Sequence, residues 1–499
     1  MRRGDNADGE RIVKRFSGAG SNRAIQSRPN PDSPQIGARR EGRRPEMGSR
    51  SIRLIGALCI LLTIPPVGAR APTILPDADG RTPLDAPTDG RACHGPHIEL
   101  GVGVGCDFSG FFTEALGLHV ALAARGTCVR TPTLSRCEPA LRGLLTPHER
   151  EAASTAGRFQ DDASQPDVDV RWHNGEDAPC PWERDSVREA EARGTLAVLR
   201  SMTEKVVLSD TLRRCCALVH ETWVPTEWHR KLYRREGCPN ARALPEAVDD
   251  RIFRGKIPGD GDSVRSDSGA DSGASLRDSK KTVFLSVFQW QHRKGPDALL
   301  KAYWNAFDAK DDVVLRIRAK VPGWAHNPFR TANDGVKHWA RALWNTSPTK
   351  LAAVEVIEVK DGEDVTREQM ASMYRSAHAF VLPSRGEGWC LPCAEAMASG
   401  TLLIASDFSG TTAFADSTNS LPVQCAVINA QKGCEPDVEG LAWRLRWTHD
   451  HRAEAAALGT KGADDIRVKF GMSAVATLWA EEGRRGLGRF DARRLVDVD

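Results

Sequence analysis

Two long stretches of the chain, residues 92–256 and 281–470, alternate short apolar runs with segments of helical periodicity. In the first stretch, HIELGVGVG predicts a strand, FFTEALGLHVALAA predicts an amphipathic helix that ends at Gly126, and DVDVRWH predicts another strand. ALVHETWVPTEWHRKLYRREG then predicts a strand and a helix with Thr226 as its N-cap. Strands that alternate with helices form parallel sheets with helices on their faces. The pattern therefore predicts an α/β protein with two domains, each built on a parallel sheet.

The second stretch opens with the buried-type strand VFLSVF, then a polar loop and a helix with one apolar side. DVVLRIRAKV, AAVEVIEVK, HAFVLPS and GTLLIAS predict further strands, and REQMASMYRSA predicts a helix. Residues 257–280, between the two stretches, are rich in Ser, Gly and Asp and predict a flexible linker. Residues 471–499 contain GMSAVATLWAEEGRRGLGRF and predict a C-terminal helix and tail.

The N-terminal part of the chain has a different character. Residues 1–46 are polar and Arg-rich without apolar periodicity, which predicts a disordered basic leader. Residues 47–71 place two arginines before the apolar run LIGALCILLTI and small residues after it, the order of a secretory signal peptide. These eleven apolar residues are fewer than the roughly 20 that span a bilayer. We expect cleavage and a secretory-pathway or secreted protein, with a membrane anchor only if residues 52–69 are retained.

Charge and cysteine content narrow the classes of function. The formal net charge is +3, and residues 1–53 hold thirteen Lys or Arg against six acids, so the rest of the chain offers no nucleic-acid footprint. One of the thirteen cysteines, Cys59, lies in the apolar run. The even number that remains suits an oxidising compartment, although spacing does not reveal the pairing. No cysteine spacing matches a zinc finger, and no metal or cofactor is expected.

A phosphate site is predicted where AFVLPS leads through RGEGWCLP into the helix CAEAMAS. Pro392 suits the first helical position and Gly400 suits the position just past the end. A helix N-terminus preceded by glycines presents backbone N–H groups that bind phosphate. Arg293 and Lys294 follow the first strand of the second domain, at the sheet edge where such folds bind ligands. Fixed cations and helix N–H groups together could stabilise a leaving diphosphate without a metal.

Three segments then carry a specific resemblance. FLSVFQWQHRKGPDALLKAY, YRSAHAFVLPSRGEGWCLPCAEAMASGTLLIAS and WVPTEWHRKLYRREG with LPEAVDDRIF together resemble glycosyltransferase family 4, also called glycosyl transferase group 1. The resemblance covers most of residues 205–425 and is strongest over 374–406. It implies the GT-B fold, in which two Rossmann-like domains face each other across a cleft. It also implies retaining transfer of a hexosyl group from a nucleotide-sugar to a glycan, protein or lipid acceptor.

The resemblance implies roles for single residues. Glu387 matches the first Glu of the family's Glu-x7-Glu pair, which faces the donor sugar, and Glu395 matches the second, which holds the ribose hydroxyls. Lys294 matches the diphosphate-binding lysine, and His173 is the candidate for a catalytic histidine of the first domain. Gln289 stands where the family often has Arg, so Arg293 is expected to supply the second cation. The implied donor-binding set is Arg293, Lys294, Gly388, Cys390, Leu391 and Glu395.

Several alternatives stay open on sequence grounds. Trp-Cys-x-Pro-Cys, with Cys390 and Cys393 before a helix, also has the form of a thioredoxin-like dithiol oxidoreductase. Glu387 and Glu395 could be the carboxylate pair of a glycoside hydrolase. An inactive sugar-binding GT-B protein is a third possibility, since Cys390 replaces the family's usual Gly. Glu114 could bind acceptor or donor, or could be a solvated helix residue.

Overall fold

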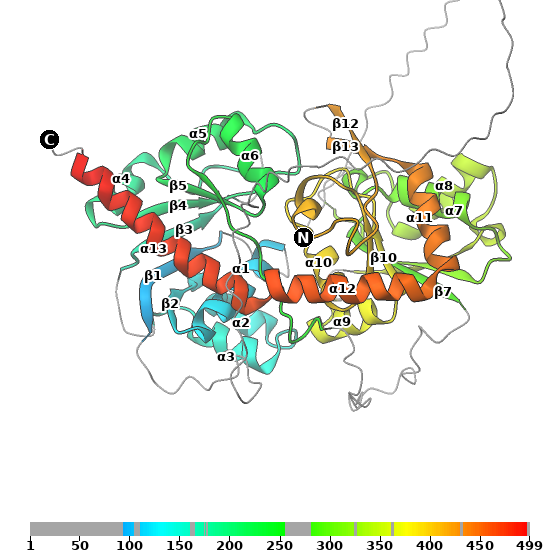
Figure 1. Ribbon diagram of the computed structural model, residues 1–499, viewed down its shortest axis with the longest axis horizontal. Helices are drawn as coiled ribbons and strands as arrows, with labels where there is room; N and C mark the ends of the chain where they lie inside the picture. Colours follow the sequence, from blue (N-terminus) through cyan, green and yellow to red (C-terminus); the bar gives the residue numbers. More distant parts are fainter. Residues whose placement is uncertain are drawn as a thin grey trace, which may run out of the picture. The chain divides into compact units, whose positions relative to one another are not determined.

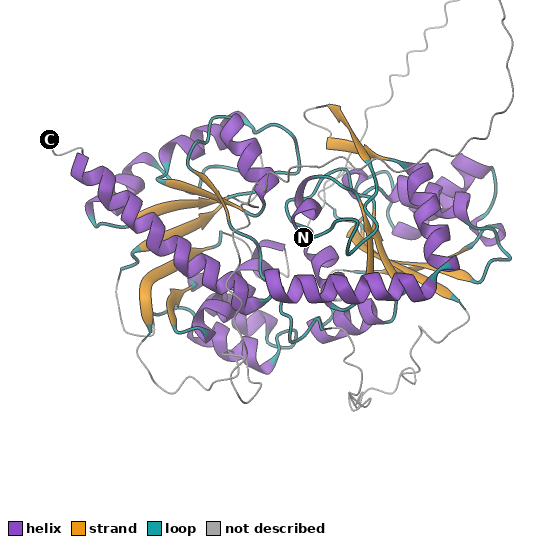
Figure 2. Cartoon of the chain, viewed as in Figure 1, coloured by secondary structure: helices purple, strands orange, loops and turns teal. Residues whose placement is uncertain are grey.

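The computed structural model describes residues 93–496, apart from gaps at 104–109, 160–164, 174, 176–177, 255–280, 324–326, 361–363 and 430–432. The predicted leader (1–46), signal segment (47–71) and linker (257–280) lie outside the described residues, as do the last residues of the tail. Two parallel sheets form the described part, each with helices on its faces (Figures 1 and 2). The predicted α/β class with two Rossmann-like domains is confirmed.

The first domain contains a sheet of order β2-β1-β3-β4-β5-β6, in which all neighbouring strands are parallel. Its strands are β1 (His94–Gly101), β2 (Thr127–Arg130), β3 (Val168–Trp172), β4 (Leu196–Arg200), β5 (Glu221–Val224) and β6 (Ala241–Ala243). Its helices are α1 (Gly110–Ala124), α2 (Pro132–Leu141), α3 (Pro147–Thr155), α4 (Arg184–Ala192), α5 (Asp210–Leu218) and α6 (Glu227–Arg235). Thr226 caps α6 as predicted, because its Oγ1 accepts the N–H of His229 at 3.1 Å.

The second domain contains a parallel sheet of order β11-β10-β7-β8-β9. Its strands are β7 (Thr282–Gln289), β8 (Val313–Lys320), β9 (Ala353–Glu358), β10 (Ala379–Leu382) and β11 (Leu402–Ala405). Its helices are α7 (Pro296–Ala306), α8 (Ala332–Trp344), α9 (Arg367–Arg375), α10 (Leu391–Ala398), α11 (Val438–Asp450) and α12 (Arg452–Phe470). A separate antiparallel hairpin pairs β12 (Cys425–Asn429) with β13 (Gly433–Pro436).

Strand β4 shows how the first sheet is buried on both faces. Leu196 and Val198 belong to one apolar core with α1, whereas Ala197 and Leu199 belong to another with α4, α5 and α6. This arrangement follows from the strand geometry, in which successive side chains point to opposite faces. A strand covered on both faces reads as a continuous apolar run, and LAVL is such a run. Strand β4 was not among the predicted strands.

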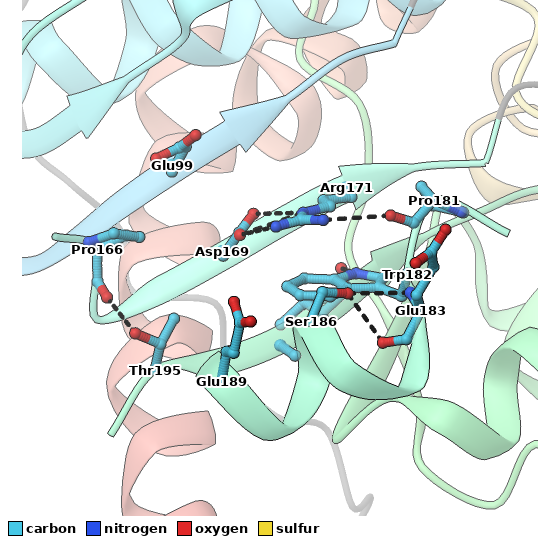
Figure 3. Close-up of polar contacts among 12 residues, drawn as sticks. Glu99, Pro166, Asp169, Arg171, Pro181, Trp182, Glu183, Ser186, Glu189 and Thr195 are labelled. Atoms are coloured by element: carbon cyan, nitrogen blue, oxygen red, sulfur yellow. Dashed lines mark hydrogen bonds and ion pairs between the residues drawn. The ribbon is translucent and has the colours of Figure 1, made fainter. Parts of the chain in front are cut away.

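Part of the first sheet carries polar side chains on one face instead. Val168, Val170 and Trp172 of β3 lie in the core, and Asp169 and Arg171 point to the other side. Figure 3 shows the Arg171 guanidinium paired with Asp169 and donating to the Pro181 carbonyl, at 3.3 Å. Its central carbon also lies 3.8 Å from the ring centre of Trp182. Burial raises the pKa of Asp169, against the opposing effect of Arg171.

The predicted C-terminal helix is α13 (Met472–Val496), which completes the core of the first domain although it follows the second (Figure 1). Trp479 is fully buried there, and its Nε1 donates to the Pro245 carbonyl at 3.1 Å. Its ring meets that of Trp223 edge-on, with centroids 5.2 Å apart. The chain thus returns to its first domain at its end. Among the described helices, none has the length and apolar character that crossing a membrane requires.

Candidate functional site

Two loops at the carboxyl edge of the second sheet are joined by hydrogen bonds. The turn η3 (His292–Lys294) follows β7, and residues 383–390 follow β10, the neighbouring strand. The Arg385 N–H donates to the Arg293 carbonyl at 2.7 Å, and Arg293 Nη1 donates to the Gly386 carbonyl at 2.7 Å. These reciprocal bonds hold the predicted cations beside the loop that carries Glu387.

Glu387 is the centre of the charge cluster in these loops. Lys294 Nζ lies 2.8 Å from both of its carboxylate oxygens, and Arg293 Nη1 lies 3.1 Å from one of them. Burial by itself would raise the pKa of Glu387, but the charges of Lys294 and Arg293 outweigh burial and hold that pKa below its ordinary value. The carboxylate therefore stays ionised, and it is satisfied by two cations at once.

The two cations differ in their surroundings. The pKa of Lys294 is lowered, first by burial and then by repulsion from Arg293, although Glu387 opposes both effects. Arg293 also pairs with Glu204 of the first domain, with Nη2 and Oε1 2.8 Å apart. Lys294 and Arg293 thus share Glu387, and Glu204 is a second partner for Arg293, so a phosphate at this site would be a further counter-ion for the two cations.

The first domain touches this loop through the residues that follow β4. A Cβ added to Gly386 would lie 2.1 Å from the Glu204 carbonyl oxygen, and one added to Gly388 would lie 2.3 Å from the Met202 sulfur. Gly386 is therefore required by close approach of the backbone after β4, whereas a side chain at residue 388 would have to displace the Met202 side chain. The carboxyl edges of the two sheets thus contribute to one region, as the ligand side of open α/β sheets is expected to do.

Arg385 connects several parts of the site and was not among the predicted site residues. Its side chain is buried, with Nη2 2.8 Å from Asp297 of α7 and 2.7 Å from Glu435 of β13. Its Nη1 also donates to the His292 carbonyl at 2.7 Å. Arg385 therefore fixes the turn that carries Lys294. No local sequence signal marks it, because its partners lie 50 to 93 residues away.

Helix α10 begins where the loop ends, with Cys390 as its N-cap. Leu391 is the first helical residue, so Pro392 occupies the second position and not the predicted first. Gly400 has φ +74° just past the helix end, as predicted. The predicted donor loop, Gly388 to Leu391, therefore leads into a helix N-terminus, whose first N–H groups lack intrahelical partners. Cys390 and Cys393 form a disulfide across the first turn.

Glu395 lies in a different environment from Glu387. Its buried carboxylate accepts a hydrogen bond from the Tyr374 hydroxyl at 3.1 Å. Burial raises the pKa of Glu395 to about 7, and the charge of Arg367 and the Tyr374 hydrogen bond only partly oppose this. Arg367 is ion-paired with Glu149 of the first domain. The structure thus turns Glu395 towards α9, and of these two glutamates only Glu387 pairs with the cations of η3.

His173 and Glu114 both lie inside the first domain. His173 is buried just past β3, and its N–H donates to the Arg200 carbonyl at 2.9 Å. Glu114, on α1, is fully buried and accepts from Trp172 Nε1 and Arg200 Nε, each at 2.8 Å. The interpretation of Glu114 as a solvated helix residue is wrong, because the hydrogen bonds and the ion pair with Arg200 fix its carboxylate in the core. The structure does not bring either residue into the charge cluster.

One group of metal-type ligands occurs among the described residues. Cys93, His97 and Cys128 lie close enough to share an ion, with their ligand atoms within 4.8 Å of one another. The two sulfurs, however, form a disulfide. The His97 Nδ1 atom is 3.2 Å from Asp167, which gives the ring a partner of its own.

Residues 359–420 match the family model described as glycosyl transferases group 1. The second domain therefore contains a segment similar to group 1 glycosyl transferases. It includes the loop after β10, Glu387, α10 and Glu395, and it confirms the family resemblance seen in the sequence.

Curated relatives agree with this assignment at low identity. The chain is 26% identical to the D-inositol 3-phosphate glycosyltransferase of Nocardiopsis dassonvillei over 226 residues, which are 43% of this chain and 46% of that one. It is 28% identical to the enzyme of the same name from Segniliparus rotundus over 171 residues, 34% of this chain and 32% of that one. The chain thus spans less than half the length of either relative.

Solved structures share the fold. Anabaena HepE in complex with UDP and glucose matches with a TM-score of 0.51 and 10% identity, over 77% of this chain and 99% of that one. Sucrose-phosphate synthase from Thermosynechococcus elongatus matches with a TM-score of 0.50 and 16% identity, over 78% and 98%. The catalytic domain of starch synthase IV from Arabidopsis thaliana, bound to ADP and acarbose, gives 0.50 and 10%, over 79% and 100%. These likenesses show the GT-B fold.

Proposed function

We propose that this protein is a retaining glycosyltransferase of the hexosyltransferase type, which moves a sugar from a nucleotide-sugar to a glycan, protein or lipid acceptor without a metal ion. The observation that carries the proposal is the sharing of one buried carboxylate, Glu387, by Lys294 and Arg293 beside the N-terminus of α10. The group 1 family match over this segment supports it. Retention of configuration rests on the family resemblance.

In this proposal the role of each residue follows from its chemistry. The diphosphate of the donor binds between the start of α10 and the two cations, because helix N–H groups and fixed positive charges both favour an anion. Lys294 and Arg293 then stabilise the negative charge that develops on the leaving nucleoside diphosphate. Glu387, ionised and held by those cations, faces the donor sugar. For Glu395 to hold the ribose hydroxyls, as the family resemblance implies, its carboxylate must exchange the Tyr374 hydrogen bond for them. His173 is the candidate catalytic histidine of the first domain.

A binding screen followed by a transfer assay tests the proposal. UDP, ADP, GDP and their glucose conjugates are added to the full chain, and a ligand that binds the native state raises the melting temperature. A glycosyltransferase should be stabilised by at least one of them, and Lys294→Ala should reduce the shift. Product anomers are then identified by NMR, with and without EDTA. Inversion at the anomeric carbon would overturn retention, and activity lost in EDTA would overturn metal independence.

Of the three alternative functions, two are less well supported. A thioredoxin-like oxidoreductase needs an accessible sulfur, whereas Cys390 is 5% exposed and Cys393 is fully buried. A glycoside hydrolase gives no role to the two cations beside Glu387, and the carboxyl of Glu395 contacts Tyr374 instead. An inactive sugar-binding protein differs from the proposed enzyme only in turnover, so stabilisation by nucleotide-sugars without transfer to any acceptor would favour it.

We further propose that the protein works in the lumen of the secretory pathway or is secreted. The described residues contain five disulfides, which accumulate in oxidising compartments. Asn345, in the sequon Asn-Thr-Ser, is exposed at the end of α8 and open to N-glycosylation. Amino-terminal sequencing of protein from its host should find a start near Arg70 or Pro72. A chain that starts at Met1 and carries reduced cysteines would overturn the proposal.

A further inference from the structure

Two residues at the candidate donor loop have an unusual backbone conformation, one within the loop and one against it. Among the described residues other than glycine, only Asn345, Cys390 and Ser409 have positive φ. Asn345 ends α8, a position where the left-handed conformation is common. Cys390 (φ +82°) lies within the segment from Glu387 to Leu391, and Ser409 (φ +58°) contacts that segment. Strained residues of this kind persist when their surroundings hold them, and they cluster at functional sites.

The Ser409 side of the loop is held by hydrogen bonds. Ser409 Oγ accepts the Glu387 N–H at 2.9 Å, and the Gly410 N–H donates to the Glu387 carbonyl at 3.0 Å. A Cβ added to Gly410 would lie 2.8 Å from backbone atoms of Gly388 and Trp389, so the two backbones are in direct contact. These contacts fix the first half of the loop, from Glu387 to Trp389. Cys390, the residue before α10, is held differently.

Cys390 is held by its covalent bond. It has φ +82° and ψ +69° as the N-cap of α10, a conformation that disfavours any residue with a Cβ. Its Sγ is bonded to Cys393 one turn later, and its carbonyl accepts the Cys393 N–H at 3.1 Å and the Ala394 N–H at 3.1 Å. Both sulfurs are buried. The cross-link therefore connects the unfavourable residue directly to the helix whose N-terminus it sets.

We infer that the Cys390–Cys393 disulfide is a positioning element of the donor site, which keeps residue 390 in a left-handed conformation that would otherwise call for glycine. The bond fixes the direction in which the loop enters α10, and with it the N–H groups at the helix start that face the diphosphate. The inference rests on the proposed function for the identity of the ligand. The cysteines act on binding through the backbone and take no part in the transfer itself.

Two double variants separate this role from the loss of a cross-link. Cys390→Ala with Cys393→Ala removes the bond and leaves a Cβ at the left-handed position. Cys390→Gly with Cys393→Ala removes the same bond but supplies the residue that adopts this conformation freely. Calorimetric titration uses whichever of UDP, ADP or GDP most stabilises the unmodified protein. The Ala/Ala variant should bind roughly tenfold more weakly. The Gly/Ala variant should stay within about threefold of the unmodified protein.

The outcomes are distinct. Equal affinity in all three proteins, or equal weakness in both variants, would overturn the positioning role. Urea unfolding supplies a readout that needs no ligand, and the Gly/Ala variant should unfold at a higher urea concentration than the Ala/Ala variant. If the unmodified protein binds none of the three nucleotides, the proposed function fails, and the urea comparison still decides the conformational claim. A lower midpoint for Gly/Ala would overturn that claim.

Discussion

Lys294 Nζ lies 2.8 Å from both carboxylate oxygens of Glu387, although 93 residues separate the two in the chain. The pairing follows from the sheet order, in which β7 is the neighbour of β10. Because neighbouring parallel strands end at the same edge, the loops after them meet there. The pair therefore places a cation and an ionised carboxylate at the entrance of α10, where the proposed donor binds.

Replacing Lys294 by Ala should slow sugar transfer by about 100-fold to 1,000-fold, because one charge-stabilising donor near a leaving diphosphate is worth about 2.7–4 kcal/mol. Initial rates at saturating donor measure the effect. Lys350→Ala, an exposed lysine in a short turn of the same domain, is the matched control and should retain the full rate. Equal rates in the two variants would remove Lys294 from the site.

Replacing Glu395 by Gln should flatten the dependence of stability on pH. The pKa of Glu395 is raised from 4.5 to about 7 in the folded protein, so its protonated form contributes stability below pH 4.5. That contribution, about 3 kcal/mol, is lost as the pH rises through about 7. The free energy of unfolding should therefore fall less between pH 5 and pH 8 in the Gln variant, on the order of the same amount.

Denaturant unfolding at both pH values measures this difference. Glu368→Gln, on the exposed side of α9, is the control and should follow the unmodified protein. Parallel pH profiles for Glu395→Gln and the unmodified protein would show that this carboxyl titrates alike in the folded and unfolded states.

Replacing Arg385 by Met should destabilise the second domain and weaken donor binding together. Removal of one partner from a buried ion pair typically costs 3–5 kcal/mol, and about 3 kcal/mol is expected here because Asp297 and Glu435 are partly exposed. Urea unfolding and nucleotide titration measure the two effects. Arg316→Met, which breaks the more exposed pair with Glu355, should lower the free energy of unfolding by less than about 1 kcal/mol. Similar losses of stability in both variants would show that Arg385 stabilises the second domain no more than the exposed Arg316 does.

Replacing Trp479 by Ala should destabilise the first domain by about 3–5 kcal/mol, since a fully buried indole leaves a cavity. The neighbouring Leu478 is 43% exposed, and Leu478→Ala should change the free energy of unfolding by less than about 0.5 kcal/mol. Unfolding followed by tryptophan fluorescence compares them. If Trp479→Ala lowered the free energy of unfolding as little as Leu478→Ala, α13 would not be part of the core of the first domain.

The sequence was sufficient for the elements with strong local signals. Thr226 as an N-cap, Gly400 past the end of α10 and the strand before Arg293 all depend on residues within a few positions of one another. β4 was missed because its apolar run, LAVL, is short, and so short a run does not distinguish a strand from a segment of buried helix. The burial of Glu114 was also missed, since its partners Trp172 and Arg200 come from distant strands.

The sequence by itself determined the α/β class, the two domains and the family likeness, because periodicity and motif spacing are local properties of the chain. Only the tertiary structure decided which charges meet. It gave Glu387 two cations, turned Glu395 towards Tyr374, and placed Arg385 between Asp297 and Glu435. It also returned α13 to the first domain. The physical reason is that burial and pairing depend on strand order and on contacts between residues far apart in the sequence, and no local pattern encodes them.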